Sequence, residues 1–149
     1  MKITFVDTET TGLDANLHEV IEFGALQTEY VDGKFNVLTK HSFKIKPQRI
    51  KDADKEALRV NGYKPEDWTE ALEQGKIAPK IRKIMTECDL LVGQRLYFDL
   101  RMIQKMLDNN KIKVFYPKYM DTKQIAEELQ EQNTSLEYLC KKYNILYEG

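Results

Sequence analysis

The chain has 149 residues, 42% of them hydrophobic and 32% charged, and its formal net charge is −1. This length and composition are typical of one folded domain with its own core, and they exclude a disordered chain. A net charge near zero gives no overall positive field, so charge alone favours an ordinary cytoplasmic protein over one that binds polyanions. An enzyme that holds a polyanion through bound cations needs less positive charge of its own, and composition leaves that class open.

Two cysteines, Cys88 and Cys140, lie far apart and match no metal-ligand spacing. Each falls in a stretch whose apolar residues recur at helical spacing, so we expect both to pack in the core as free thiols. The apolar run at the N-terminus is too short for a secretion signal, and no stretch approaches the length of a membrane span. We therefore expect a cytoplasmic protein with no membrane contact.

The first part of the chain predicts three strands in an antiparallel meander. Residues 2–6 form a first apolar strand, and residues 20–30 nearly alternate between apolar and polar side chains, as a second strand would. Asp32 and Gly33 are typical of a hairpin turn, which leads into a third strand over residues 35–46.

The rest of the chain predicts helices alternating with short strands. Asp52 or Asp54 can cap a short helix that ends near residues 61–62, and Pro79 suits the first turn of the next helix. Further elements are expected in the order strand, helix, strand, over residues 89–93, 98–107 and 114–120.

Two more helices are expected at the end of the chain. Asp121 can cap the first of them, and residues 134–137 form a capping box that opens the second. We see no repeat and no flexible linker, so residues 1–149 are expected to form a single domain. A meander followed by alternating helices and strands predicts an α/β fold, with helices packed on a mixed sheet.

The segment that bears chemistry is residues 5–13 (FVDTETTGL), where a strand runs into two acids. Residues i and i+2 of a strand point to the same side, so the carboxylates of Asp7 and Glu9 converge. A divalent cation relieves the repulsion between them, and oxygen ligands favour Mg²⁺ or Mn²⁺. Taken without its context, such a pair is more often two surface acids at the end of a strand.

The context resembles a known family. Residues 5–13 are similar to the first motif of the DnaQ-like (DEDD) 3′–5′ exonucleases, the group that contains the proofreading subunit of bacterial DNA polymerase III. Residues 18–25 (HEVIEFGA) resemble the second strand of that family, and residues 91–100 (LVGQRLYFDL) resemble its second acidic motif. The resemblance covers essentially the whole chain in the family's order. It implies an RNase H-like fold and metal-dependent hydrolysis of nucleic acid from the 3′ end.

The resemblance also implies roles for the matched acids. Asp7 would bridge two metal ions, Glu9 would ligate the ion that activates water, and Asp99 would serve the second ion. Two ions about 4 Å apart stabilise the attacking and leaving oxygens of an in-line displacement. The cofactor expected from this resemblance is Mg²⁺ or Mn²⁺, and the expected partner is the 3′ end of a single-stranded nucleic acid.

Further matched positions are expected to contact the substrate, namely Thr10, Gly12, Leu13, Gln94, Arg95 and Phe98. Gly12 would let the backbone approach the 3′-terminal nucleotide closely. Leu13 either wedges against a base or packs in the core, and Phe98 either stacks on a base or begins a helix as a buried aromatic side chain. Gln94 and Arg95 replace the His-Asn of many relatives, which implies altered contacts with a phosphate or sugar.

The family's third motif, His-x4-Asp or Tyr-x3-Asp, has no match before Gly149. We therefore expect a domain without the C-terminal helix that bears this motif, and weak catalysis, because the loss of a general base typically costs about 10²–10⁴-fold in rate. Asp121 is the nearest substitute by position, but helix capping explains it better.

Two hypotheses follow from the resemblance, and a third, an unrelated small cytosolic domain with a chance acidic pair, is disfavoured by two motifs in the family's order. The first is an exonuclease domain whose third motif is supplied by a longer chain or by a partner chain, such as a polymerase. The second is a degenerate exonuclease fold that binds nucleic-acid ends or a protein without cutting. Thr8 and Thr10 resemble the DNA-proofreading relatives and favour DNA over RNA. Basic residues cluster over residues 40–59 and either line a path for the strand or form a solvated face.

Overall fold

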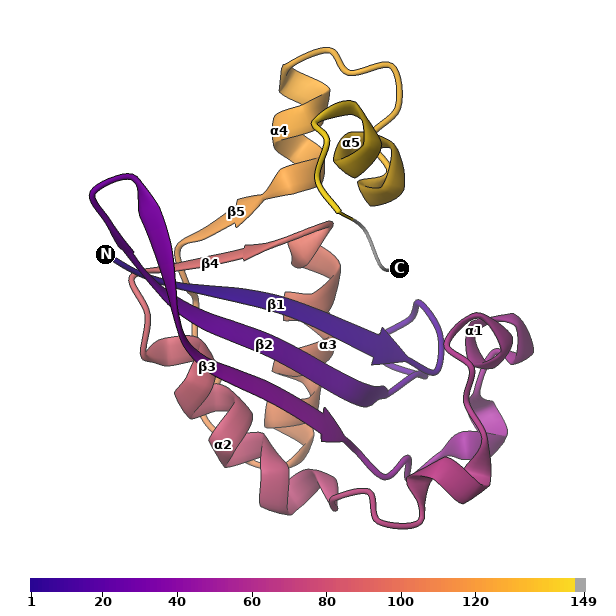
Figure 1. Cartoon of the computed structure of the whole chain (residues 1–149). Coiled ribbons are helices and arrows are strands. Elements are labelled where there is room, and N and C mark those ends of the chain that lie inside the picture. Colours follow the sequence, from indigo (N-terminus) through magenta and orange to yellow (C-terminus); the bar gives the residue numbers. More distant parts are fainter. Residues whose placement is uncertain (147–149) are drawn as a thin grey trace.

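The fold is built on a five-stranded sheet in the order β3-β2-β1-β4-β5 (Figure 1). The structure is a computed structural model and describes residues 1–146. Its strands are β1 (Lys2–Thr10), β2 (Val20–Val31), β3 (Lys34–Lys44), β4 (Leu90–Gly93) and β5 (Tyr119–Asp121). The first three strands form the predicted antiparallel meander, β4 pairs parallel with β1, and β5 pairs parallel with β4. The predicted mixed α/β sheet is thus confirmed.

Five α-helices and two short 3₁₀ turns are assigned within the described residues. The helices are α1 (Lys55–Val60), α2 (Gln74–Thr86), α3 (Leu96–Asn109), α4 (Thr122–Glu128) and α5 (Leu136–Lys142), and the 3₁₀ turns are η1 (Ile50–Asp52) and η2 (Pro65–Trp68). The predicted capping residues Asp54 and Asp121 accept backbone N–H groups at the starts of α1 and α4. At α5 the capping residue is Ser135, one position later than the capping box predicts.

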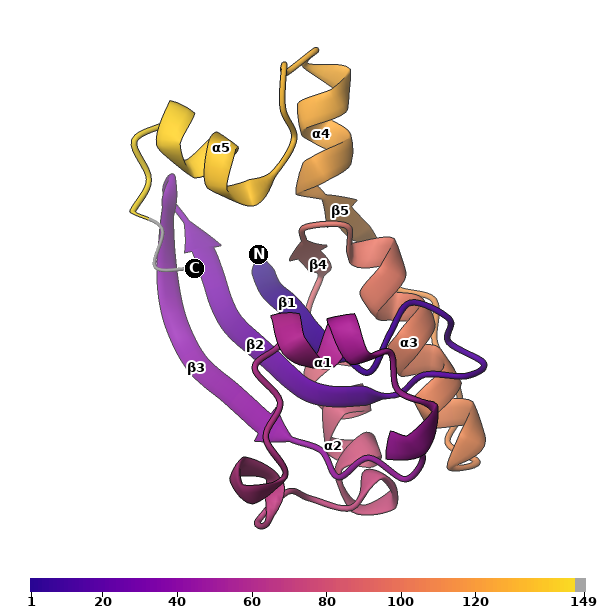
Figure 2. The same ribbon diagram turned by 90° about the vertical axis from the view of Figure 1, so that its right-hand side faces the viewer.

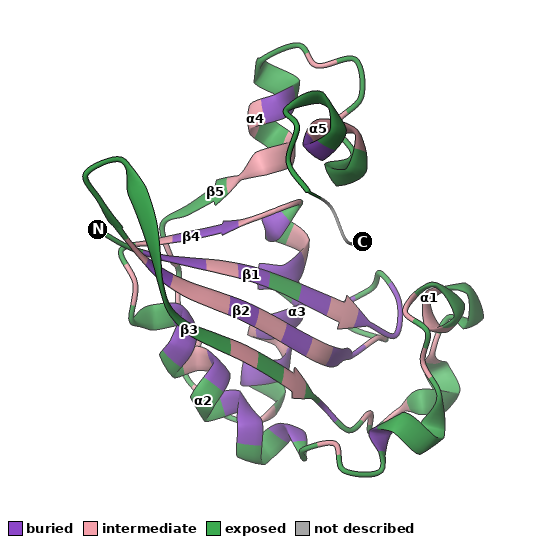
Figure 3. Cartoon of the chain, in the orientation of Figure 1, coloured by how far each residue is buried: buried purple, intermediate pink, exposed green. Residues whose placement is uncertain are grey.

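The core lies between the sheet and the helices α2 and α3, which cover one of its faces (Figures 1 and 3). Their apolar side chains recur at helical spacing and turn toward the strands, as Ile77, Ile81, Met85, Ile103 and Leu107 do. Each large aliphatic side chain buried there contributes about 1.5–3 kcal/mol to stability. Cys88 packs against this core and Cys140 is buried, both as free thiols, as predicted.

The opposite face of the sheet is largely open. The helices α4 and α5 form a projecting lobe, and α5 lies over one end of this open face (Figures 1 and 2). Hydrogen bonds attach the lobe to the end of β4, including one of 2.7 Å from Gln94 Nε2 to the carbonyl of Thr134. Because α5 covers only one end of this face, the part that carries Asp7 and Glu9 is accessible (Figures 1 and 2).

Three predicted boundaries were wrong. The first strand was predicted over residues 2–6, but β1 continues to Thr10 because it stays paired with β2 as far as Val20. α2 begins at Gln74, so Pro79 lies inside the helix. Pro79 is tolerated there on the exposed side, where helical carbonyls can tilt toward water. The last strand covers only Tyr119–Asp121 rather than residues 114–120. Val114 and Phe115 do pack against the core, but Pro117 lacks the N–H group that a paired strand needs.

No helix within residues 1–146 is both long enough and apolar enough to cross a membrane.

Candidate active site

Asp7 and Glu9 stand on the open face of the sheet, near the end of the central strand. The strand alternates its side chains, so Thr8 between them points the other way, toward α3. β4 pairs with β1 only as far as Phe5, and the second half of β1 has no strand neighbour on that side. The first turn of α3 fills this space and brings Asp99 to Thr8.

Thr8 and Asp99 form a buried contact. The hydroxyl of Thr8 donates a hydrogen bond of 2.5 Å to the Asp99 carboxylate, whose residue is only 3% exposed. Burial raises the pKa of Asp99 to about 7, although the Thr8 hydroxyl lowers it in part, and the negative charge of Asp7 raises it further. Near neutral pH this carboxyl group is poised between its protonated and ionised forms.

The pKa values of Asp7 and Glu9 are raised as well. The side chain of Asp7 is exposed, yet neighbouring groups remove part of its hydration, and this desolvation raises its pKa while the backbone N–H of Thr8 lowers it. Desolvation also raises the pKa of Glu9, followed by the charges of Asp7 and Glu22. A bound cation would relieve both the desolvation and the repulsion.

Glu22 is a fourth acid at this site, and the sequence reasoning missed it. The register pairs Glu9 with Glu22 and Asp7 with Gly24 on the neighbouring strand β2. The sequence did carry a signal for it, because Glu22 is an acid placed between the apolar residues Ile21 and Phe23 of β2. Gly24 has no side chain, so space is left directly beside the Asp7 carboxylate for an ion or a substrate group.

The acids fit a divalent cation by their chemistry but do not close around one. Across the described residues 1–146, no three His, Cys, Asp or Glu side chains converge closely enough to hold a metal ion. One oxygen of the Asp99 carboxylate accepts a hydrogen bond from Thr8, and the charge of Asp7 acts on the same carboxyl group. The oxygen ligands expected for Mg²⁺ or Mn²⁺ are therefore present at one end of the sheet, though not yet assembled.

The loop after β1 carries three of the expected substrate residues. Thr10 is buried, and its hydroxyl donates to the carbonyl of Gly12 at 2.9 Å. Gly12 has φ +152°, and a Cβ atom there would lie 2.5 Å from the His18 ring, so internal packing already requires glycine. Leu13 is 78% exposed, which makes the core-packing alternative wrong and leaves its contact with a base a prediction.

The other expected substrate residues, Gln94, Arg95 and Phe98, lie just before α3 or in its first turn. Both ends of the Gln94 amide are engaged, by the Thr134 carbonyl at 2.7 Å and by the Thr122 hydroxyl at 2.5 Å. Arg95 adopts a left-handed conformation with φ 58°, and its backbone N–H donates to Asp121. Phe98 is half-buried against the core, as the packing alternative predicts. Substrate roles for Gln94, Arg95 and Phe98 stay predictions.

The basic cluster over residues 40–59 is largely occupied by contacts within the chain. Four of its cations have partners: Lys44 over the ring of Trp68, Lys46 with Glu73, Arg49 with Glu19, and Arg59 with Glu56. This pattern favours a mostly structural and solvated face over a continuous path for a nucleic-acid strand.

An apolar groove of about 580 Å³ opens beside Asp7 on the free face of the sheet. Its walls come from β1, β2 and β4 on one side and from the α4–α5 lobe on the other, and include Phe5, Ala25, Leu26, Val92, Leu136, Cys140 and Ile145. A contiguous apolar surface of this kind next to a charged site is typical of a place where something else binds.

Comparison with known proteins identifies the family. The family model RNase_T, described as "Exonuclease", matches residues 4–149. The chain belongs to this exonuclease family. Its members are hydrolases of phosphodiester bonds, and the predicted resemblance to DnaQ-like exonucleases is confirmed.

Among individual proteins, this exonuclease-family chain is 27% identical over 142 residues to the PolC-type DNA polymerase III of Ureaplasma parvum serovar 3, covering 95% of the chain but 10% of the polymerase. Its fold matches E. coli exonuclease I in complex with a dT13 oligonucleotide, with TM-score 0.82, 19% identity, 99% of this chain and 36% of that one covered. A zinc-bound exonuclease I–ssDNA complex from E. coli matches with TM-score 0.83, at 19% identity, 99% and 36% coverage. The RNase H-like fold is thereby confirmed, and the chain spans about a third or less of these relatives' lengths.

Proposed function

We propose that this chain is a metal-dependent 3′–5′ exonuclease domain that hydrolyses single-stranded nucleic acid, with DNA as the favoured substrate. The observation that carries the proposal is the placement of Asp7 and Glu9 on the open face of the sheet, with Asp99 beside them at the start of α3. The chain belongs to an exonuclease family, which supports the assignment of these acids to the two motifs predicted from the sequence.

The acids Asp7, Glu9 and Asp99 would hold Mg²⁺ or Mn²⁺, which when bound supplies charge stabilisation for an in-line displacement at phosphorus. The hydroxyl of Thr8 would keep the Asp99 carboxylate close to β1. Gly24 leaves room beside Asp7 for the terminal phosphodiester. Each of these residues acts through position and charge, which is how proteins catalyse phosphoryl transfer in general.

Substrate contacts would come from the two segments that border the acids. Leu13 projects into solvent from the loop after β1 and would pack against the terminal base, while Thr10 and Gly12 shape the backbone beneath it. The guanidinium of Arg95 is exposed at the start of α3 and would pair with a phosphate. DNA is favoured because the matched relatives are a DNA polymerase and an exonuclease bound to a deoxythymidine oligonucleotide.

We further propose that the groove beside Asp7 accepts a segment that carries the third motif, from a longer chain or from a partner such as a polymerase. Its apolar walls and its position next to Asp7 suit a packed helix that presents a polar side chain toward the acids. The 149-residue chain would then hydrolyse slowly on its own, about 10²–10⁴-fold below a complete site. A cytoplasmic location is part of the same proposal.

The test is the shortening of a 5′-labelled single strand by purified chain, in the presence of Mg²⁺ or Mn²⁺ and in the presence of EDTA. We expect a ladder of shortened products that needs the metal and that disappears in Asp7→Asn. The exposed surface variant Glu87→Gln is the control and should match the wild type. If wild type and Asp7→Asn leave the strand equally intact at high protein concentration, the chain is not an exonuclease by itself.

A second candidate function is a binding module that holds nucleic-acid ends or a protein partner without cutting. The acids that do not converge and the open apolar groove favour it. The two candidates differ in their response to Asp7→Asn, which would leave the binding of a strand or partner intact in a module while abolishing hydrolysis in an enzyme. The measurement is the Kd of a single strand for wild type and Asp7→Asn, in Ca²⁺, alongside hydrolysis in Mg²⁺. Equal Kd values with no hydrolysis by the wild type favour the binding module, and hydrolysis that Asp7→Asn abolishes favours the enzyme.

A further inference from the structure

Only two acidic or basic residues are buried in the described part of the chain, Asp99 and Glu19. Asp99 belongs to the candidate active site, whereas the proposed chemistry gives Glu19 no role. Glu19 is 7% exposed and stands just before β2, at the end of the loop that carries Gly12 and Leu13. A buried carboxylate is costly unless hydrogen bonds and a counter-charge compensate it, so its contacts show what it is for.

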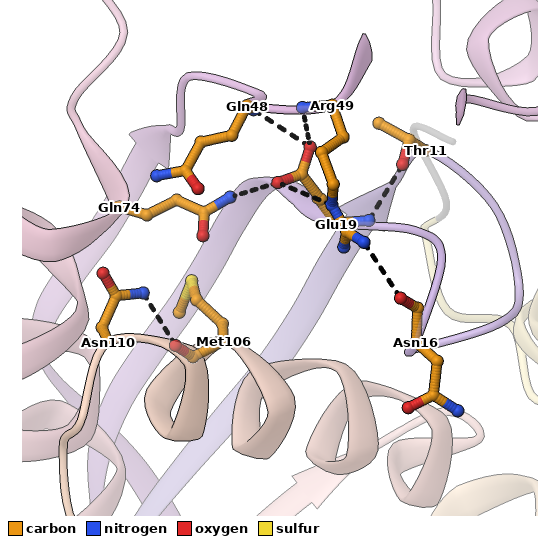
Figure 4. Close-up of polar contacts among 8 residues, drawn as sticks. All are labelled: Thr11, Asn16, Glu19, Gln48, Arg49, Gln74, Met106 and Asn110. Carbon is orange, nitrogen blue, oxygen red and sulfur yellow. Dashed lines mark hydrogen bonds and ion pairs between the residues drawn. The ribbon is translucent and has the colours of Figure 1, made fainter. Parts of the chain in front are cut away.

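The Glu19 carboxylate collects donors from two other segments (Figure 4). Its Oε2 atom accepts the backbone N–H groups of Gln48 and Arg49 at 3.0 and 2.7 Å. Its Oε1 atom accepts Gln74 Nε2 at 3.0 Å, and Arg49 Nε lies 3.8 Å from the same oxygen. One side chain thus joins the segment after β3 and the first residue of α2 to the start of β2.

The backbone of Glu19 in turn closes the loop after β1. Its N–H donates to the Thr11 hydroxyl at 2.9 Å, and its carbonyl accepts the N–H of Thr11 at 2.9 Å. The Arg49 guanidinium donates a hydrogen bond of 3.0 Å to the carbonyl of Asn16, which lies in the middle of the loop (Figure 4). The backbone of Glu19 therefore joins the two ends of the loop, and its carboxylate reaches the middle of the loop through Arg49.

The same loop is bonded to both ends of α1. The N–H of Asp54 donates to the carbonyl of Thr11 at 2.8 Å, and Asn61 Nδ2 donates to the carbonyl of Thr10 at 2.7 Å. Hydrogen bonds therefore join residues 48–61 to the loop. Figures 1 and 2 show α1 near the end of β1. The Glu19 carboxylate joins this set of segments through Gln48 and Arg49.

We propose that Glu19 is a positioning residue of the site: its buried carboxylate holds the loop that carries Thr10, Gly12 and Leu13 in register with Asp7 and Glu9. The inference rests on the proposed exonuclease function and deepens it. A 3′-terminal nucleotide lying on this loop is aligned with the acids only while the loop keeps its place. A shift of about 1 Å in substrate position can cost about 10²-fold in rate.

The test compares Glu19→Gln with Glu87→Gln, an exposed glutamate at the far end of α2 whose ion pair with Lys83 is also lost. The amide introduced by Glu19→Gln has one oxygen in place of two, so it cannot accept both the backbone N–H groups and Gln74. We expect the KM for a single-stranded 3′ end to rise about tenfold or more, with Mn²⁺ affinity within about twofold of the wild type. We also expect hydrogen exchange at the amides of Thr11 and Asp54 to accelerate in Glu19→Gln alone.

A merely structural role would lower the Tm and leave KM and loop exchange unchanged in the folded fraction. That result overturns the inference. If Glu19→Gln does not fold, Arg49→Ala removes the bond to Asn16 and should raise KM in the same way, while an unchanged KM overturns the proposal. Partial rescue of KM by Glu19→Asp supports it. A wild-type chain that neither binds nor shortens the strand overturns the proposed function itself. If the wild type is active and the KM of Glu19→Gln equals that of the wild type, only the role of Glu19 is overturned.

Discussion

The hydroxyl of Thr8 and the carboxylate of Asp99 meet at 2.5 Å, although 91 positions separate them in the chain. Thr8 is the residue between the two acids of the first motif, and its side chain points to the opposite face from theirs. Through this contact β1 fixes the position of the acid from the second motif. The two predicted motifs are therefore connected directly by one hydrogen bond, on the opposite face of β1 from Asp7 and Glu9.

Thr8→Val should disconnect Asp99 from β1. The variant leaves a buried carboxyl group without its side-chain donor, which costs about 1–3 kcal/mol in the free energy of unfolding and raises the pKa of Asp99 further. Urea denaturation and an NMR titration of Asp99 measure the two effects. Thr39→Val on the exposed strand β3 is the matched control, and equal losses in the two variants would mean that the buried contact contributes nothing.

Asp99→Asn should stabilise the metal-free chain above neutral pH. The folded pKa of about 7 lies above the ordinary value of 3.8, so the folded state retains a proton that the unfolded state has lost. Stability from this group is complete below about pH 4 and is lost as the pH rises through 7. In urea denaturation with EDTA, the free energy of unfolding of Asp99→Asn should exceed that of the wild type by on the order of 2–4 kcal/mol at pH 8. Near pH 4 the two free energies should be equal. A constant difference across this pH range would contradict the prediction.

Glu22→Gln should lower the pKa of Glu9. The two carboxylates face each other across β1 and β2, and the charge of Glu22 is one of the causes that raise this pKa. Removal of a like charge directly opposite should also stabilise the chain at pH 7 by about 0.2–1 kcal/mol. The readouts are an NMR titration of Glu9 and thermal unfolding. Glu29→Gln, on the same strand but away from the acids, should leave the titration of Glu9 where it was.

Gly12→Ala should destabilise the chain more than Gly33→Ala. Both glycines have positive φ, but only Gly12 lies against another side chain, the ring of His18. Backbone strain alone costs on the order of 1–3 kcal/mol, and the overlap with His18 adds to it. Replacement of His18 by alanine in the Gly12→Ala background should recover part of the loss. No recovery in chemical denaturation would show that backbone strain is the whole effect.

Mn²⁺ should raise the Tm of the wild type and leave that of Asp7→Asn unchanged. A ligand that binds only the folded state stabilises it by about 2.7 kcal/mol at a concentration 100 times its Kd. The metal also favours the ionised acids, so the gain should be larger at pH 8 than at pH 6. A Tm that rises equally in both proteins would place the binding elsewhere.

Several parts of the fold and site follow from short-range patterns. Alternation along β1 puts Asp7 and Glu9 on one face, and the Asp32–Gly33 turn joins β2 to β3, because both depend only on neighbouring residues. Helix boundaries were less predictable. Proline usually lies in the first turn of a helix. Here the residues before Pro79 pack onto the core, and this packing extends α2 toward the N-terminus despite the local preference.

The sequence by itself determined which acids are proposed to bear the chemistry, the order of the strands along the chain and the family to which the chain belongs. Tertiary structure decided how those acids are held. The register of β1 on β2 sets Glu22 opposite Glu9, and the end of β4 lets α3 bring Asp99 to Thr8. The fold also buries the Glu19 carboxylate against the backbone of Gln48 and Arg49 and the side chain of Gln74. Each of these contacts joins residues that are far apart in the chain, and its partner depends on how whole elements pack, which no local pattern specifies.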